Sequence, residues 1–216
     1  MTPRMTSVFA AFTQKDFDIF QIPGLEPRMT QIKAHIRPKL EQIGTQLQPF
    51  LSELLRVPVH VHVAKHARRT VNPPDSTWVA WSANVRGYKA HPHFQVGLWS
   101  SHLFIWFALF PEAEKAKPVF AQNFSRHLDK LLAQIPENFL WSFDHTRPDA
   151  KSHSDLKKED FLDLIRRLQT VKKSEVLCGI HLPKTETALQ HPTELEQIIQ
   201  QTFQQLAPLY RLAISD

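Results

Sequence analysis

The densest group of basic side chains in the sequence follows a short run of alternating apolar and polar residues at 59–63. The group consists of Lys65, His66, Arg68 and Arg69. An arginine side chain offers a planar set of donors that matches the oxygens of phosphate and carboxylate groups. Asp75 is the only acid nearby in the sequence, so local pairing does not neutralise these cations. We therefore predict an anion site that takes a nucleotide, a phosphometabolite or a nucleic acid.

Further basic side chains lie at the expected ends of neighbouring strands and in turns: His62, Arg86, Lys89, His93 and His102. They join the same site if the strands run back and forth and bring those ends together. Trp78, Tyr88 and Trp99 are interleaved with them, and such rings can stack on bases, although the core is their more usual place. The alternative is that this segment is a solvated, charged loop beside a sheet.

Two pairs of histidines have a spacing that puts both imidazoles on one face of an extended segment, where they can ligate zinc or iron. The pairs are His60 with His62 and His91 with His93. No cysteine pair, no His-Glu-x-x-His helix and no clear carboxylate companion accompanies them. The sequence therefore predicts neither a metal site nor a cofactor.

Two other pairs have the composition of a catalytic dyad. Asp144 precedes His145, but adjacent residues of a strand point to opposite faces, so this acid is poorly placed to orient its neighbour. Cys178 and His181 lie three residues apart on an expected strand and therefore also face opposite sides. We interpret Asp144 as a cap of the loop that follows it, and Cys178 as a buried, inert thiol.

The common motifs of nucleotide hydrolysis, ester hydrolysis and dinucleotide binding are absent from the sequence. The leading hypothesis is therefore a non-catalytic protein that binds a phosphate-bearing ligand through the His, Arg and Lys cluster. One alternative is a small-molecule hydrolase or transferase that uses His62, His66 or His93 for acid–base chemistry. The other alternative is a protein-interaction module.

The overall composition agrees with a globular protein that meets anions. The chain has 216 residues, 26 Lys and Arg against 21 Asp and Glu, and 12 His. The net charge of +5 favours anionic partners without requiring nucleic acid, and the histidines should make the protein more basic as the pH falls. The single cysteine permits no intrachain disulfide, and no apolar run approaches the length of a membrane span. We expect a cytoplasmic protein with no membrane partner.

Hydrophobic periodicity predicts the elements that position these residues. Runs typical of strands lie at 59–63, 77–82, 93–99, 103–110, 140–143 and 175–182. The run at 103–110 is apolar on both faces, which is typical of a covered central strand. Apolar residues at steps of three and four predict helices at 29–54, 118–135, 161–168 and 192–206, the first of them kinked or divided at its prolines and glycine.

Consecutive strands flanked by helices predict an α+β fold, with a mainly antiparallel sheet of about five or six strands packed with amphipathic helices. No composition shift or long linker divides the chain. We therefore interpret residues 1–216 as a single domain, with residues 1–12 as a disordered N-terminal tail.

Several strings spread over the chain, from about residue 16 to residue 212, resemble a known protein family. They include HVAKHARR at 62–69, VNPP at 71–74, RGYK at 86–89, PHFQ at 92–95, DHT at 144–146 and LQTVKK at 168–173. The sequence resembles the YktB-like family of uncharacterised proteins from Gram-positive bacteria. The resemblance implies a single α+β domain and no known activity. His60 and His91 lie outside the matching pattern.

Overall fold

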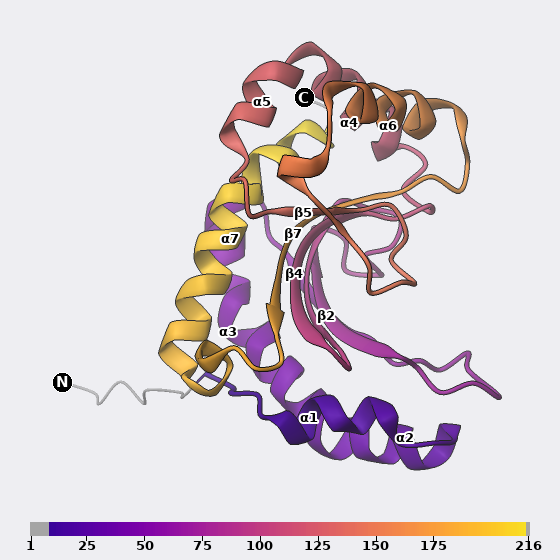
Figure 1. The fold of residues 1–216 in the computed structure, drawn as a ribbon, viewed down its shortest axis with the longest axis vertical. Coiled ribbons are helices and arrows are strands. Elements are labelled where there is room, and N and C mark those ends of the chain that lie inside the picture. The colour runs from indigo at the N-terminus through magenta and orange to yellow at the C-terminus, as the bar shows by residue number, and fades with distance from the viewer. Residues whose placement is uncertain (1–8, 215–216) are drawn as a thin grey trace.

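A seven-stranded antiparallel sheet organises the computed structural model, which describes residues 9–214 (Figure 1). The strands lie in the order β1 (His60–Val63), β2 (Ser76–Ser82), β3 (His93–Trp99), β4 (His102–Leu109), β7 (Val176–Pro183), β5 (Leu140–Ser142) and β6 (Lys151–Ser152). The predicted α+β class with an antiparallel sheet is confirmed. The sheet exceeds the expected strand count because a two-residue strand, β6, lies within a segment whose polar sequence predicts a loop.

The strand β4 lies in the centre of the sheet, paired with β3 on one side and β7 on the other. All eight of its residues are buried. Its sequence explains this position, since Phe104 and Trp106 alternate with Leu103, Ile105 and Phe107 and leave no polar face for solvent. The predicted central strand is confirmed.

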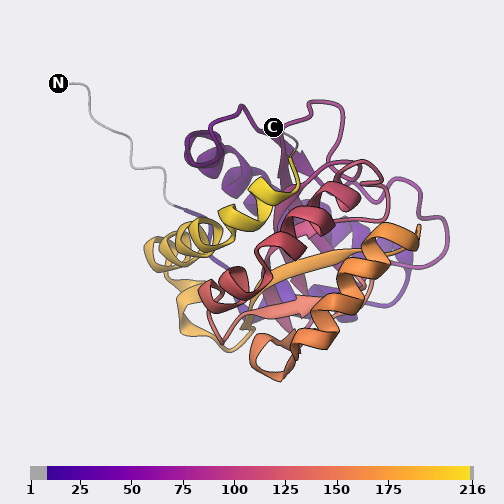
Figure 2. The same cartoon turned by 90° about the horizontal axis from the view of Figure 1, so that it is seen from above.

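The helices and the sheet share one large hydrophobic core. The helices are α1 (Gln14–Asp18), α2 (Leu25–Gln31), α3 (Arg37–Leu55), α4 (Ala116–Arg126), α5 (Leu128–Gln134), α6 (Lys158–Thr170) and α7 (Pro192–Leu212). Helices α3 and α7 pack along one face of the sheet, whereas α4, α5 and α6 gather at one end (Figures 1 and 2). Short 3-10 turns lie at Ile19–Gln21, His153–Asp155 and Thr187–Gln190. None of the helices within residues 9–214 is both long enough and apolar enough to cross a bilayer.

The helical pattern predicted at 29–54 is divided where a π-helical turn, Ile32–Ile36, separates α2 from α3. Pro38 follows this turn at the start of α3, while Pro49 lies inside the helix without ending it. Gly44 does not interrupt α3 but allows the helix to pack closely on the sheet, since a Cβ here would lie 2.5 Å from Cγ1 of Val61. Its carbonyl also accepts a 2.9 Å hydrogen bond from Nε1 of Trp81, so the missing side chain lets α3 settle on the sheet.

The N-terminal tail predicted at residues 1–12 falls partly outside the described residues, which begin at residue 9. Within the described part, Phe9, Ala10 and Phe12 are buried. The backbone N–H of Phe12 donates to the carbonyl of Leu189 at 2.8 Å. Residues 9–12 therefore belong to the packed domain, because their apolar side chains join its core.

Candidate functional site

The two faces of the sheet differ in chemistry. Cross-strand partners share a face, and the pairs Ala80 with Gln95, Gln95 with Trp106, and Trp106 with Gly179 trace the face that is turned away from α3 and α7. This surface, called the concave face below because the strands curve around it in Figure 1, carries His62, Ser76, Trp78, His93, Gln95, Trp99, His102, Phe104, Trp106, Ser142 and His181. The opposite face is apolar apart from Thr77 and, at the edge strand β6, Lys151, so the polar and imidazole side chains of the sheet lie mainly on the concave face.

A narrow cavity follows the concave face along β4 and has a volume of about 20 Å³. Its aromatic lining consists of Trp78, Trp99, Phe104, Trp106 and Phe110, with Gln95, His145, Arg147 and His181 among the polar residues. A Cβ at Gly97 would lie 2.4 Å from the Phe104 ring, and one at Gly179 would lie 2.9 Å from the Trp106 ring. The two glycines therefore let these rings lie flat on the sheet, and the remaining space suits about one water molecule.

At one end of the concave face, the buried His93 ring lies in a network of hydrogen bonds and ring contacts. Nδ1 of His93 donates to the carbonyl of His91 at 2.8 Å, and Nε2 of Gln95 donates to Nε2 of His93 at 3.0 Å. The Tyr88 ring lies edge-on to His93 with centroids 5.0 Å apart, and its hydroxyl accepts a 3.0 Å bond from Nε1 of Trp78. Burial lowers the pKa of His93 to about 3, so this imidazole is neutral at pH 7.

A pair of histidine rings, His102 and His181, lies at the other end of β4. The rings of His102 and His181 stack with centroids 3.6 Å apart, and Nδ1 of His102 lies 2.8 Å from Oγ of Ser101. Burial lowers the pKa of His102 to about 4 and that of His181 to about 3. Among residues 9–214, Nε2 of His102 finds no hydrogen-bond partner. The two stacked imidazoles are therefore neutral at pH 7.

The basic segment predicted from the sequence surrounds His66. Its ring lies edge-on to Trp78, with centroids 5.7 Å apart, and its Nε2 is 3.1 Å from Oγ1 of Thr77. Burial, together with the positive charges of Arg69, Arg37 and Lys89, lowers the pKa of His66 to about 4. Cations from α3, from the loop at 64–75 and from the turn at 83–92 therefore converge on one imidazole.

Few carboxylates neutralise these cations. Asp75 pairs instead with Arg28, which lies 3.0 Å away and also donates to the carbonyls of Ile22 and Pro74. Arg69 donates to carbonyls of its own loop, those of Asn72 and Pro73. Across the described part of the chain, no ion pair involves Lys65, Arg68, Arg69 or Arg86, and Lys89 reaches Glu112 only at 3.9 Å.

The residues predicted for the anion site fall into separate groups. His66, Arg69 and Lys89 interact electrostatically, whereas His62 and His93 belong to the neighbouring Tyr88 network. His102 lies far from both groups. The cross-strand partner of His93 is Ala108, six residues from His102 along β4, which corresponds to about 20 Å at roughly 3.3 Å per residue. Arg68 and Arg86 are exposed. Lys65 lies beside a residue that the sequence analysis missed, Arg37, whose Nη2 donates to the Lys65 carbonyl at 3.5 Å.

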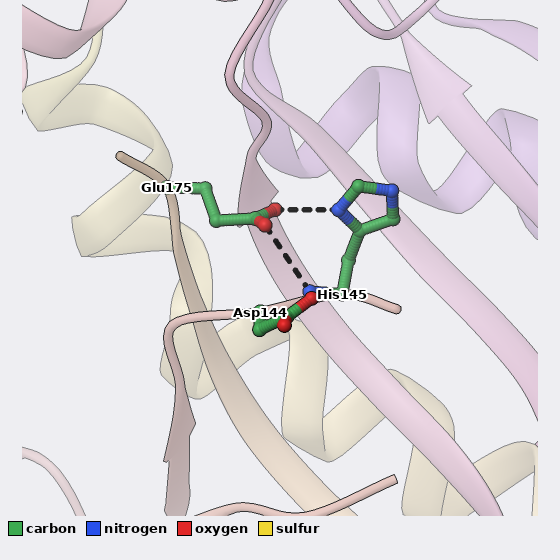
Figure 3. Close-up of side chains that lie close together, drawn as sticks. All are labelled: Asp144, His145 and Glu175. Carbon is green, nitrogen blue, oxygen red and sulfur yellow. Dashed lines mark hydrogen bonds and ion pairs between the residues drawn. The ribbon is translucent and has the colours of Figure 1, made fainter. Parts of the chain in front are cut away.

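A histidine and a buried carboxylate meet beside the cavity (Figure 3). Nδ1 of His145 donates to Oε2 of Glu175 at 2.7 Å, and the backbone N–H of His145 donates to Oε1 at 3.3 Å. The His145 ring also stacks on Phe110, with centroids 4.0 Å apart. Glu175 was missed because thirty residues separate it from His145, and only the pairing of β5 with β7 brings the two together.

The neighbouring acid, Asp144, has the role expected from the sequence. Its Oδ1 accepts bonds from the backbone N–H and the hydroxyl of Thr146, at 2.9 Å and 2.5 Å. The hydroxyl of Thr146 is the main reason that the pKa of Asp144 is lowered. Asp144 therefore caps the loop after β5 and does not orient the His145 ring, although its carboxylate lies close to Glu175 (Figure 3).

The interpretation of Cys178 as a buried thiol is confirmed. Cys178 is 0% exposed and unpaired, and burial raises the pKa of its thiol. It lies on the apolar face of β7, opposite Phe107, whereas His181 lies on the concave face opposite Phe104. The two side chains therefore cannot form a dyad.

Comparison with known proteins agrees with the resemblance seen in the sequence. Residues 12–210 match a family model described as a domain of unknown function, DUF1054. A UPF0637 protein of Bacillus licheniformis is 48% identical over 201 residues, which is 93% of this chain and 95% of that protein. UPF0637 proteins of Bacillus mycoides and Bacillus cytotoxicus are 48% and 47% identical over 201 residues, 93% of this chain and 96% of each relative. The chain therefore belongs to the DUF1054 family, whose function is unassigned.

Proposed function

We propose that this protein is a binding protein for a phosphate-bearing ligand, whose phosphate group lies against Arg37, Lys65, His66 and Arg69. The observation that carries the proposal is the convergence of cations from separate elements around His66, with little compensation by carboxylates. Gathering like charges costs free energy unless solvent or a counter-ion offsets their repulsion. A bound phosphate supplies that counter-charge and accepts hydrogen bonds from the guanidinium groups.

The surroundings of the cluster favour a nucleotide over inorganic phosphate. Trp78 lies against His66 and also lines the aromatic cavity, so a base that stacks on its ring would keep a phosphate within reach of the cations. The cavity itself holds only about one water molecule in this conformation, so the proposal places the ligand at its mouth. A cytoplasmic location belongs to the same proposal, and the single, unpaired cysteine supports it.

The alternative of acid–base catalysis by the histidines named in the sequence has weaker support. His62 bonds to the carbonyl of Asn84 at 2.9 Å, and burial lowers its pKa. The two ring nitrogens of His93 are both engaged, and the pKa of His66 lies at about 4. A general base at neutral pH works best with a pKa near that pH, so these rings are poorly tuned for the task.

Calorimetric titration with pyrophosphate, ATP and a short oligothymidylate tests the proposal. Arg69→Ala and Lys65→Ala should each weaken binding by about 1–3 kcal/mol, or roughly 5- to 150-fold in Kd. Arg126→Ala is the matched control, because Arg126 is an exposed arginine on α4 outside the cluster. Tighter binding of ATP than of pyrophosphate supports the stacking role of Trp78, whereas a steep salt dependence with the oligonucleotide indicates a polymeric ligand.

Two results would contradict the proposal. One is the absence of binding by all three probes. The other is binding that Arg69→Ala, Lys65→Ala and Arg126→Ala weaken equally, because general surface charge would then explain it. Both loop variants should fold normally, since Lys65 and Arg69 are exposed and take part in no ion pair within residues 9–214.

A further inference from the structure

Asp144, His145 and Glu175 form a second cluster that the proposed anion site does not use (Figure 3). Each offers one ligand atom of a type that metals bind, and the three atoms all lie within 4.8 Å of one another. The loop after β5 supplies Asp144 and His145, and the residue just before β7 supplies Glu175. Strand pairing between β5 and β7 holds the two segments together, so the cluster is built on the sheet.

The charges within this cluster are incompletely balanced by its contacts. Glu175 is 6% exposed, and the hydrogen bonds that it accepts come from the backbone and the ring of His145. The nearest buried ammonium, that of Lys117, donates to the carbonyls of Pro111, Lys172 and Ser174, which uses all three of its protons. Among the described residues, His145 is therefore the only titratable group that hydrogen-bonds to either carboxylate, whereas Lys117 acts on Glu175 and Arg147 acts on Asp144 only as charges at longer range. A divalent cation between the two carboxylates would neutralise both.

The geometry and accessibility of the cluster suit an ion. Stacking on Phe110 fixes the plane of the His145 ring, and its Nδ1, which lies 2.7 Å from Oε2 of Glu175, can coordinate an ion once that ion replaces the proton shared with the carboxylate. Ligand atoms around a tetrahedral zinc ion lie about 3.3 Å apart. The three ligand atoms here lie within 4.8 Å, with Nδ1 of His145 and Oε2 of Glu175 at 2.7 Å, so small side-chain shifts would adjust the cluster to the ion. His145 lines the narrow cavity of the concave face, and Glu175 lines a larger one of about 290 Å³ beside α6. Asp144 and His145 are themselves half-buried, so an ion can reach the cluster from solvent and can keep open coordination positions.

We infer that Asp144, His145 and Glu175 bind one divalent first-row transition-metal ion, with zinc as the preferred occupant. An imidazole nitrogen with two carboxylate oxygens suits zinc, iron or manganese, whereas magnesium and calcium prefer oxygen ligands throughout. Three protein ligands leave at least one position for water or a bound group, as in catalytic zinc sites. The inference is independent of the anion site around His66, which shares no residue with this cluster.

Equilibrium binding of zinc to protein stripped with a chelator tests the inference, with cobalt as a spectroscopic substitute and magnesium as the negative probe. We expect one tight zinc site, visible-range cobalt absorption typical of low coordination number, and no comparable magnesium binding. Glu175→Gln and His145→Gln should each weaken zinc binding by at least about tenfold. Asp144→Asn should also weaken it while keeping the loop cap, since an asparagine oxygen still accepts from Thr146.

His191→Gln is the control, because His191 is exposed and lies outside the cluster, and this variant should retain full zinc affinity. The 12 histidines of the chain make adventitious zinc binding a real alternative. The inference would be overturned if Glu175→Gln and Asp144→Asn bound zinc as tightly as the wild type does and melted at the wild-type temperature. Failure of the wild-type protein to bind zinc, cobalt or manganese would also overturn it and leave a structural hydrogen bond between His145 and Glu175.

Discussion

Burial holds several histidines of this protein in their neutral form. The pKa of His93 and of His181 is lowered from 6.5 to about 3, and that of His66 and of His102 to about 4. The sequence predicts growing basic character as the pH falls through the histidine range. These four side chains contribute to it only under more acidic conditions, because charging them requires burial of an unpaired cation.

The neutral histidines predict a loss of stability in acid. Above pH 6.5 they are neutral in both the folded and the unfolded chain, so they add no pH dependence there. As the pH falls from 6.5 towards about 3, the unfolded chain binds protons that the folded chain does not, and the free energy of unfolding decreases. Urea unfolding at several pH values between 7 and 4 measures this decline.

His181→Gln isolates one of these contributions. The variant removes a titrating group whose pKa is lowered by burial, so its stability should fall less steeply between pH 6.5 and about 4 than that of the wild type. His127→Gln is the control, since His127 is exposed, and it should preserve the wild-type slope. Parallel stability curves for the wild type and His181→Gln would show that burial does not perturb His181.

At the scale of elements, the contact between α3 and the sheet depends on a missing side chain. Gly44→Ala should favour the helix by about 1 kcal/mol through its propensity. The new Cβ would lie 2.5 Å from Val61 and 3.0 Å from Val79, so α3 must move away from β1 and β2. Overpacking of this kind costs about 1–3 kcal/mol, and we therefore expect a net loss of stability in thermal unfolding.

The half-buried Gly87 provides the comparison for that experiment. A Cβ there meets no atom within 4 Å, and the residue does not have a positive φ, so Gly87→Ala should leave the melting temperature nearly unchanged. Equal melting temperatures for Gly44→Ala and Gly87→Ala would contradict the packing role of Gly44. A raised melting temperature for Gly44→Ala would show that helix propensity outweighs the steric conflict.

Element positions could be predicted wherever periodicity was strong. Alternation located β3 at its observed bounds, and two-sided apolarity identified β4 as central. The last helix was expected to end at residue 206 but continues to Leu212, with Pro208 inside it, because its apolar face still packs against the core there. The two-residue β6 has no periodicity, so only its pairing with β5 reveals it.

At the scale of the whole molecule, prediction of the sites was less complete. The close spacing of basic residues in the sequence pointed to Lys65, His66 and Arg69, but only the fold brings Arg37 to them from α3. The same holds for Glu175, which the sheet order places beside His145. Sequence spacing reports on neighbours within one element, whereas both candidate sites combine elements distant in the chain, so their membership depends on topology.

The same topology makes Cys178 a reporter of global unfolding. It is 0% exposed on the helix-facing side of β7, within the core that joins the helices to the sheet. β7 pairs with β4 and β5, so exposing the thiol requires separation of central elements rather than fraying of an edge. Under native conditions, labelling by a thiol reagent should therefore be slow and should accelerate with urea at the slope of global unfolding. Rapid labelling that is independent of urea would instead reveal a local opening of the sheet at β7, and a core less cooperative than its packing implies.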